Sequence, residues 1–341
     1  MDPDGALRML DLEGAPEGTY GELEPPGPAL IDGRGRVRLS FSRIDTYESC
    51  PRKFRYAHVD RLPARPGPHL SFGISIHRAL EAFYDRKLPS CPTEDELLGF
   101  LYERWDASGF AELSRAEQVE FYRHAQAVLR GFHRREAPGY RLPAATEAWF
   151  ELPVAYEAVV VGSIDRVDVD DDGHLHVVDY KTNRKVKDRT RVASSLQLAL
   201  YALACRHLYG ALPATVSLDF VVPGVRITVA REELDLEAAR RAVLETAAAV
   251  RAESYGPTPG PLCDWCDFKP LCPAWSPSEP PELLLGPATE RLRALRRQVT
   301  RDVRSLRELE AGVARVAAEL AAEPGADPGS GPDGSGPPAR T

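Results

Sequence analysis

Two acidic residues and a lysine interrupt apolar, β-branched stretches in the middle of this 341-residue chain. Asp165 closes GSID after the run AVVV, and Asp179 and Lys181 flank Tyr180 in VVDYK. Because side chains alternate along a strand, Asp179 and Lys181 point to one face, while Tyr180 points away and offers its backbone carbonyl. Buried charges need partners, so we expect these groups to meet at a shared site.

These groups suit a hard divalent cation. Asp165, arriving from the neighbouring strand, would complete an oxygen cage with Asp179 and the Tyr180 carbonyl, the ligand type that Mg²⁺ and Mn²⁺ prefer. A bound metal would polarise a phosphate and acidify water, and Lys181 would orient that water or neutralise developing charge. A D-x-K triplet alone also fits a surface ion pair with Asp165 at a turn, because short motifs often match by chance.

A second constellation lies near residue 270. Cys263, Cys266 and Cys272 form C-x₂-C-x₅-C, and three thiolates at this spacing call for a fourth ligand. The spacing by itself favours structural zinc over an iron–sulfur cluster. A disulfide framework is not expected for a chain that we assign to the cytoplasm, where thiols stay reduced. Cys91 and Cys205 lack companions and are expected to be ordinary thiols.

The elements that must position these groups alternate between helical and strand patterns. Apolar residues at helical spacing predict a helix over 71–84 that carries His77 and a longer helical region over 93–135. Ser42 is expected to cap a helix interrupted at Pro51, which leaves Cys50 near a kink. Strands are predicted at 147–154, 158–170, 174–182, 215–222 and 225–230, and further helices at 194–208 and 236–252. This order favours an α/β fold in which helices flank a mixed central sheet.

The two ends of the chain have a different composition. Residues 1–36 are rich in Gly, Pro and acidic groups and predict a disordered leader, followed by the folded domain over 37–280. Apolar residues three and four apart predict a long amphipathic C-terminal helix over 281–322, which would dock a partner or fold back on its own domain. The Gly/Pro/Ser-rich residues 323–341 are expected to be a disordered tail.

Charge limits where a nucleic acid would bind. The formal charge of −8 excludes nonspecific binding over the whole surface. A local run directly after Lys181 supplies positive charge through Arg184, Lys185, Lys187, Arg189 and Arg191. Such a run is usually a solvated loop, but beside a metal site it is suited to binding phosphates. No apolar stretch approaches the length of a membrane span and no signal segment is visible, so we expect a cytoplasmic protein.

The acidic motifs and the helix that follows them resemble a known family. GSIDRVD, then VVDYKT, then QLALY, is similar to the PD-(D/E)XK core of RecB-type nucleases. The resemblance implies a restriction-endonuclease-like fold and five catalytic residues, namely Asp165, Asp179, Lys181, Gln197 and Tyr201. The acidic member of the D-x-K pair is Asp here, which the family pattern allows.

The same resemblance adds ligands at both ends of the domain. The family carries a metal-binding histidine on an upstream helix, usually after a glycine, and FGISIHRAL matches it with Gly73 and His77. AddB and CRISPR-associated RecB-like exonucleases place one cysteine ahead of the nuclease motifs and three behind them. This arrangement implies that Cys50 joins the three downstream cysteines around a 4Fe-4S cluster that staples the domain together.

The activity that the resemblance implies is Mg²⁺- or Mn²⁺-dependent hydrolysis of DNA. We expect an exonuclease acting on single-stranded ends in DNA repair or recombination. The sequence has no Walker A pattern G-x-x-x-x-G-K-[ST], so any ATP-driven motor would come from a helicase subunit. Two alternatives remain open: a non-catalytic DNA-binding subunit of a helicase–nuclease complex, and the same nuclease with structural zinc in place of iron–sulfur.

Overall fold

The computed structural model describes residues 29–64, 66–85 and 90–275, all within one compact unit that extends to Trp275. Residues 29–36, at the end of the expected leader, form a turn in which Ile31 pairs with Val37 and Asp32 binds Arg36. The rest of that leader, the predicted helix over 281–322 and the predicted tail over 323–341 lie outside the described residues. Within the described ranges, no helix has both the length and the apolar content needed to cross a bilayer.

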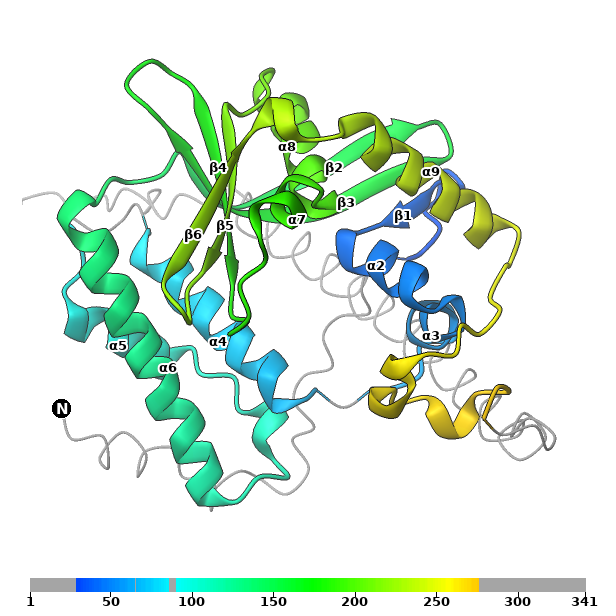
Figure 1. Ribbon diagram of the computed structural model, residues 1–341, viewed down its shortest axis with the longest axis horizontal. Coiled ribbons are helices and arrows are strands. Elements are labelled where there is room, and N and C mark those ends of the chain that lie inside the picture. The colour runs from blue at the N-terminus through cyan, green and yellow to red at the C-terminus, as the bar shows by residue number, and fades with distance from the viewer. Residues whose placement is uncertain (1–28, 65, 86–89, 276–341) are drawn as a thin grey trace, which may run out of the picture. The chain divides into compact units, whose positions relative to one another are not determined.

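A six-stranded mixed sheet forms the centre of the molecule (Figure 1). Its strands are β1 (Val37–Leu39), β2 (Ala145–Ala155), β3 (Ala158–Val169), β4 (Leu175–Lys181), β5 (Thr215–Phe220) and β6 (Val225–Ala230). Strand β3 pairs with β2 along one edge, and with β1 and β4 at opposite ends of the other edge. The β4–β5 pair is parallel and the β5–β6 pair antiparallel. This mixed sheet confirms the fold class expected from the sequence.

Helices cover both faces of the sheet. They are α2 (Phe41–Ser49), α3 (Pro51–Phe54), α4 (Pro68–Phe83), α5 (Glu94–Glu103), α6 (Arg115–Glu136), α7 (Arg189–Ala193), α8 (Leu196–Tyr209) and α9 (Leu236–Arg251). Helices α8 and α9 share one apolar core with β1, β2 and β3, while α4, α5 and α6 share a second core with outward residues of β4 (Figure 1). The sheet therefore lies between two separately packed helical layers.

Strand β4 divides its side chains between these cores as the sequence predicted. Val177 belongs to the core under α8, and Val178 and Tyr180 belong to the core under α4 to α6. Alternation along the strand then directs Asp179 and Lys181 toward the side of α8. The hairpin between β3 and β4 turns at residues 170–174, with Gly173 at φ +83°, a conformation that glycine adopts without steric cost.

The N-terminal helix is interrupted as expected, but it begins earlier. Ser40, not Ser42, is the N-cap of α2, because the Ser40 hydroxyl accepts the Arg43 N–H. Cys50 has an extended backbone between α2 and α3, and Pro51 starts α3. A π-helical turn, Arg55–Val59, follows α3. The break confirms that Cys50 lies at a kink, where its thiol is displaced from the helical faces on either side.

Two further differences concern the strand and helix boundaries. The sequence pattern predicted five strands and missed β1, whose three residues are too few to show periodicity. The region 93–135 divides into α5 and α6, each with its own capping box, started by Thr93 and Ser114. The helix expected at 194–208 is α8, capped by Ser195 and ended by Gly210 at φ +77°.

Candidate active site

The interior of β3 and the end of β4, which pair antiparallel, bring the predicted acidic residues together. The backbone N–H of Tyr180 donates to Asp165 Oδ2 at 2.8 Å, so the two strands are tied at the point where both carboxylates emerge. His77 on α4 places Nδ1 3.4 Å from the same Asp165 oxygen. The ring of Tyr180 is buried on the opposite face and meets the His77 ring edge-to-face, with 6.2 Å between centroids. Three separate elements thus converge on one acidic centre.

Glu147 is a fourth member of this centre that the motif analysis missed. The pairs Thr146 with Arg166 and Ala148 with Ile164 place Glu147 of β2 across from Asp165. Potential ligand atoms of His77, Glu147 and Asp165 all lie within 4.8 Å of one another. Glu147 has φ +44°, a left-handed conformation that costs non-glycine residues energy and often marks functional positions. Only its register against Asp165 could have revealed it in the sequence.

Burial and crowded carboxylates shift the acid–base behaviour of this centre. Burial, reinforced by the charge of Asp179 and Glu147, raises the pKa of Asp165 well above its ordinary value, although the Tyr180 N–H opposes the shift. Burial lowers the pKa of His77, partly opposed by the same two carboxylates and by a hydrogen bond to the Tyr180 backbone. The centre therefore favours a neutral imidazole and disfavours ionisation of all of its carboxylates at once.

Asp179 forms an ion pair with Lys181 but lacks a well-aligned hydrogen bond on the same oxygen. Its side chain is 2% exposed, and Oδ2 lies 2.7 Å from the Lys181 ammonium. Within the described part of the chain, however, that oxygen has no partner in hydrogen-bonding geometry. The Lys181 ammonium instead donates to Gln197 Oε1 at 2.7 Å. A buried acceptor without a hydrogen bond is costly unless something else, such as a cation, completes it.

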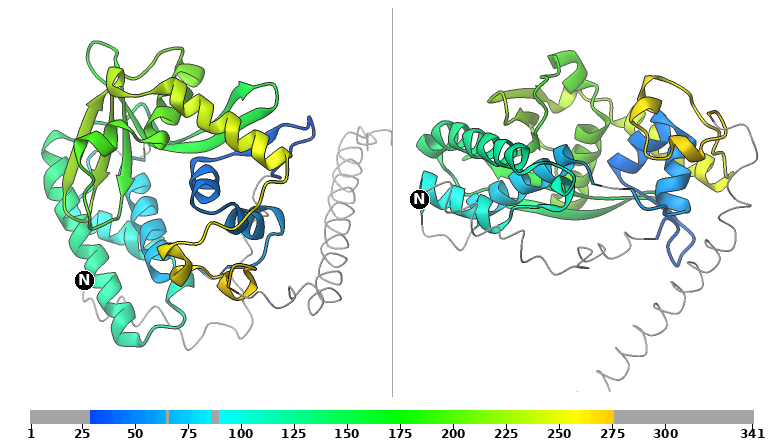
Figure 2. Two further views of the ribbon diagram at one scale, coloured as in Figure 1. Left: turned by 45° about the vertical axis from the view of Figure 1, so that its right-hand side comes forward. Right: turned by 90° about the horizontal axis from the view of Figure 1, so that it is seen from below.

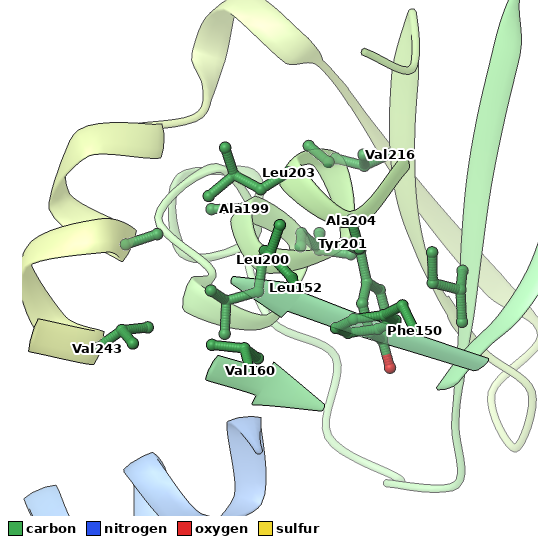
Figure 3. Close-up of a cluster of buried hydrophobic side chains, with 14 of the residues drawn as sticks. Phe150, Leu152, Val160, Ala199, Leu200, Tyr201, Leu203, Ala204, Val216 and Val243 are labelled. Carbon is green, nitrogen blue, oxygen red and sulfur yellow. The ribbon is translucent and has the colours of Figure 1, made fainter. Parts of the chain in front are cut away.

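Lys181 is held by a chain of side chains on α8. Gln197 accepts from Lys181 and donates through Nε2 to the Tyr201 hydroxyl at 3.0 Å. The Tyr201 ring packs among the buried side chains between α8 and β2, close to Phe150 (Figure 3), with 6.1 Å between ring centroids. Burial and nearby Asp179 raise the pKa of Tyr201, so it stays protonated. This position suits Tyr201 to orienting Gln197 and, through it, Lys181.

Helix α4 comes unusually close to the end of β4. A Cβ added at Gly73 would lie 3.2 Å from the Thr182 hydroxyl, tighter than ordinary contact. The small residue thus lets α4 set His77, one turn further on, against the acidic centre. A hollow of about 570 Å³ opens there, lined by residues that include His77, Glu147 and Thr182. The predicted Gly73 and His77 pattern accordingly has a local structural reason.

The donor set fits a hard divalent cation. The carboxylates of Asp165 and Glu147 and the imidazole of His77 bring ligand atoms within 4.8 Å of one another, and oxygen ligands are those that Mg²⁺ and Mn²⁺ prefer. Asp179, the other predicted carboxylate ligand, is not part of that group; its charge raises the pKa of Asp165, and its Oδ2 lies 2.7 Å from the Lys181 ammonium. A second acidic group, Asp170 with Asp172 and His174, lies at the exposed hairpin between β3 and β4. Asp170 Oδ1 there already accepts hydrogen bonds from the backbone N–H groups of Asp172 and His174. This second group is therefore more exposed than the acidic centre and is held by the turn itself.

The four predicted cysteine ligands meet at the other end of the domain. Residues 261–275 return beside α3, as both views in Figure 2 show, and Tyr56 donates to the Leu271 carbonyl at 2.7 Å. All four thiols line one hollow of about 350 Å³: Cys50, Cys263, Cys266 and Cys272. Segments more than 200 residues apart in the chain are thereby brought to one site, and all four thiols are free.

Backbone N–H groups point at two of these thiols. The Thr258 N–H lies 3.5 Å from Cys50 Sγ, and the Gly260 N–H lies 3.3 Å from Cys263 Sγ. Four thiols around one hollow are a ligand set that a structural zinc ion or an iron–sulfur cluster can use.

The predicted basic run divides after β4. Arg184, Lys185 and Lys187 are exposed on the loop, whereas Arg189 bonds to the Thr228 carbonyl and to Glu233. Arg191 lies 3.6 Å from Asp188, the N-cap of α7. The first part of the run is therefore better suited to contacting phosphates than the second.

Comparisons with known proteins agree with this geometry. A family model described as the PD-(D/E)XK nuclease superfamily matches residues 38–273, which span the sheet, the acidic centre and all four cysteines. The gene 69 protein of Mycobacterium phage D29 is 27% identical over 269 residues, covering 69% of this chain and 96% of its own length. Its counterpart in phage L5 is 26% identical over 287 residues, with the same coverage.

Two more distant similarities complete the comparison. One subunit of the ATP-dependent helicase/deoxyribonuclease of Streptococcus equi subsp. zooepidemicus is 35% identical over 101 residues, which are 26% of this chain and 9% of that subunit. The crystal structure of SSO0001 is 17% identical with a TM-score of 0.32, and the match covers 70% of this chain and 86% of that one.

Proposed function

The chain belongs to the PD-(D/E)XK nuclease superfamily, and on this basis we propose that it is a metal-dependent deoxyribonuclease that removes nucleotides from the ends of single-stranded DNA. The observation that carries the proposal is the group of His77, Glu147 and Asp165, whose ligand atoms lie within 4.8 Å of one another, next to the Asp179–Lys181 ion pair. Carboxylates gathered away from water are costly unless a cation is bound among them, so this arrangement suits metal binding better than a purely structural role.

In this proposal each group of the acidic centre has a defined task. Asp165, Asp179, Glu147, His77 and the Tyr180 carbonyl would hold Mg²⁺ or Mn²⁺, which supplies an acidified water and polarises the phosphate when bound. The neutral imidazole of His77 keeps a nitrogen lone pair for this purpose.

Lys181 acts on the reacting groups beside that centre. Its ammonium, fixed by Gln197, directs positive charge at the developing charge on the phosphate. Tyr201 is a positioning residue that acts through Gln197.

Phosphate binding in this proposal rests on the basic residues that surround the site. The protein carries a net charge of −8, so phosphates must be bound locally, and the exposed Arg184, Lys185 and Lys187 follow the catalytic strand directly. Arg189 and Arg191 would strengthen the same positive field from the start of α7. None of these contacts reads bases, which supports degradation without sequence specificity.

We propose that Cys50, Cys263, Cys266 and Cys272 hold a 4Fe-4S cluster that joins the start of the domain to its end. The proposal is supported by the four thiols lining one hollow and by the resemblance to nucleases that split their cluster cysteines in the same way, one ahead of the nuclease motifs and three behind them. Anaerobic purification should yield about four iron and four sulfide per chain. Stoichiometric zinc without iron in the purified protein would contradict the cluster.

A partner remains part of the proposal. Local similarity to one subunit of an ATP-dependent helicase/deoxyribonuclease, and the absence of a Walker A pattern in this sequence, favour a helicase subunit that supplies single strands. We propose a nuclease domain over 37–280, flanked by a leader, a C-terminal helix and a tail. We also propose that the protein acts in DNA repair or recombination. The competing function is a DNA-binding subunit of such a complex without turnover.

One experiment separates these possibilities. Cluster-loaded protein is incubated with Mg²⁺ or Mn²⁺ and with 5′- or 3′-labelled single-stranded, double-stranded and circular DNA, with Lys181→Ala as the control. We expect mononucleotides or short products from linear single strands, none from circles, and none with Lys181→Ala. Tight DNA binding without products, in folded wild-type protein, would instead establish the binding subunit.

A further inference from the structure

A second hollow lies next to the acidic centre, and four of its nine lining residues carry aromatic rings. It measures about 510 Å³, within the range of about 300–1,000 Å³ typical of small-molecule sites. His69 and Phe72 contribute from α4, and Phe121 and His124 from α6, which lies beside α4 (Figure 1). We call this hollow the aromatic pocket; none of its four rings takes part in the centre described above.

The aromatic pocket is a neighbour of the acidic centre. The hollow that contains His77 and Glu147 shares His69, Leu70 and Thr182 with the aromatic pocket. Thr182 follows Lys181 directly in the chain, and it is the residue that α4 approaches at Gly73. A DNA strand whose phosphate is held at the acidic centre therefore has the aromatic pocket within reach of its adjoining nucleotides.

The rings of the pocket are preorganised by each other. Phe72 and His124 are stacked, with 5.3 Å between centroids and 12° between planes. His69 meets Phe121 edge-to-face at 5.7 Å, and Phe121 packs in the same way on Phe72 at 6.2 Å. Phe72 is buried, while Phe121 and His124 are half-buried where they line the pocket. Rings braced in this way offer a flat apolar surface at little cost in side-chain entropy.

The polar rim of the pocket matches the phosphodiester chain. Arg184 reaches the rim from the exposed basic loop, with Asn183 and Thr182 beside it. Burial and the nearby Arg184 lower the pKa of His124, so its ring is neutral and presents an apolar face. Glu120 also lines the pocket, so the positive charge available to a phosphate is that of Arg184. A cationic side chain at the rim and aromatic rings inside are the combination by which single-strand binding grooves hold a backbone and stack its bases.

We propose that the aromatic pocket takes a nucleobase of the single DNA strand whose phosphate is bound at the acidic centre. The inference rests on the proposed function and deepens it, because it gives a physical reason for single-strand preference. A base in a duplex is stacked on both faces and paired at its edge, so it reaches such a pocket only after it is unpaired and unstacked. Stacking on rings is tolerant of sequence, since every base has a flat face.

The test measures binding without turnover. All variants carry Lys181→Ala, which serves as a common non-cleaving background, and Mg²⁺ is present throughout. Fluorescence anisotropy measures the Kd for a labelled single-stranded oligonucleotide and for a series in which one nucleotide at a time is abasic. Phe121→Ala and His124→Ala remove rings of the pocket, Phe121→Tyr keeps a ring, and Phe100→Ala removes a ring of the same helical layer outside the pocket. Thermal unfolding verifies that each variant is folded.

Loss of one stacking ring should weaken binding about five- to hundredfold. We expect this loss in Phe121→Ala and His124→Ala and not in Phe121→Tyr or Phe100→Ala. With Lys181→Ala alone, an oligonucleotide that is abasic at one particular position should bind more weakly by a similar factor. The same abasic position should cause no further loss of affinity when Phe121→Ala is also present, because both changes remove the same contact.

Two results overturn the inference in distinguishable ways. If the losses from Phe121→Ala and from every abasic position simply add, or if the ring variants bind like Lys181→Ala alone, the base lies elsewhere while the nuclease proposal stands. If wild-type protein neither degrades nor binds any DNA in Mg²⁺, the result contradicts the proposed function and, with it, the assignment of the aromatic pocket to a nucleobase.

Discussion

Replacing Glu147 by glycine should stabilise the metal-free protein and weaken its binding of Mn²⁺, two effects of opposite sign. The φ of +44° costs a non-glycine residue about 1–2 kcal/mol, whereas glycine in a strand costs about 0.5–1 kcal/mol in entropy. The substitution also removes a carboxylate that crowds Asp165. We expect a net gain of up to about 1 kcal/mol, which raises the unfolding midpoint by about 2–4 °C.

The loss of metal affinity follows from the same side chain. Glu147 offers an oxygen within 4.8 Å of the ligand atoms of His77 and Asp165. Losing even an outer partner of a metal site weakens binding about 10- to 100-fold, so we expect at least that from Glu147→Gly in Mn²⁺ titration calorimetry. Glu147→Gln keeps the left-handed backbone and removes the charge, so it should lose the affinity and gain less stability than Glu147→Gly.

Glu253 provides a matched control. It is an exposed glutamate that follows α9 with φ +51°, away from the acidic centre. Glu253→Gly should raise the midpoint through the same relief of backbone strain and leave Mn²⁺ affinity unchanged. A Glu147→Gly protein that melts earlier than wild type, or that binds Mn²⁺ as tightly, would refute the role assigned to this residue.

Three further predictions concern positioning, the cysteine site and pH. Gln197→Ala should slow single-turnover DNA hydrolysis about 10- to 100-fold, because the Lys181 ammonium loses a charge-assisted hydrogen bond of about 1.5–3 kcal/mol; an unchanged rate would contradict this role. Cys50→Ser should lower bound iron and the unfolding midpoint, whereas Cys91→Ser should alter neither; equal iron in both would exclude Cys50 as a ligand. Burial lowers the pKa of His58 to about 4, so the folded protein disfavours the proton that the unfolded chain binds below about 6.5. The free energy of unfolding, measured by chemical denaturation, should therefore fall between pH 6.5 and 4 by a larger amount in wild type than in His58→Gln. Equal decreases in the two proteins would refute the role assigned to His58.

Local patterns accounted for most of the sheet and for the direction of its catalytic side chains. Alternation in VVDYK was sufficient to place Asp179 and Lys181 on one face and Tyr180 on the other. Periodicity likewise located α4 and α8, and with them His77, Gln197 and Tyr201. These predictions succeeded because each depends on residues only a few positions apart.

Features that depend on long-range pairing were not accessible in this way. Glu147 became part of the centre through the register of β2 against β3, which no local pattern fixes. The aromatic pocket depends on α6 packing beside α4, so no local pattern singles out Phe121 or His124 in the sequence. The partner for the three downstream cysteines came only from a family resemblance, because Cys50 lies more than 200 residues upstream.

The most direct test of the central claim is Mg²⁺- or Mn²⁺-dependent hydrolysis of end-labelled single-stranded DNA by wild type, Asp179→Asn and Asp172→Asn. Asp172 belongs to the exposed acidic group at the β3–β4 hairpin and controls for loss of any carboxylate near a strand end. The account predicts metal-dependent products from wild type and Asp172→Asn, and a loss of at least about a hundredfold in folded Asp179→Asn. Hydrolysis that persists in Asp179→Asn, or that proceeds equally without a divalent metal, would contradict it.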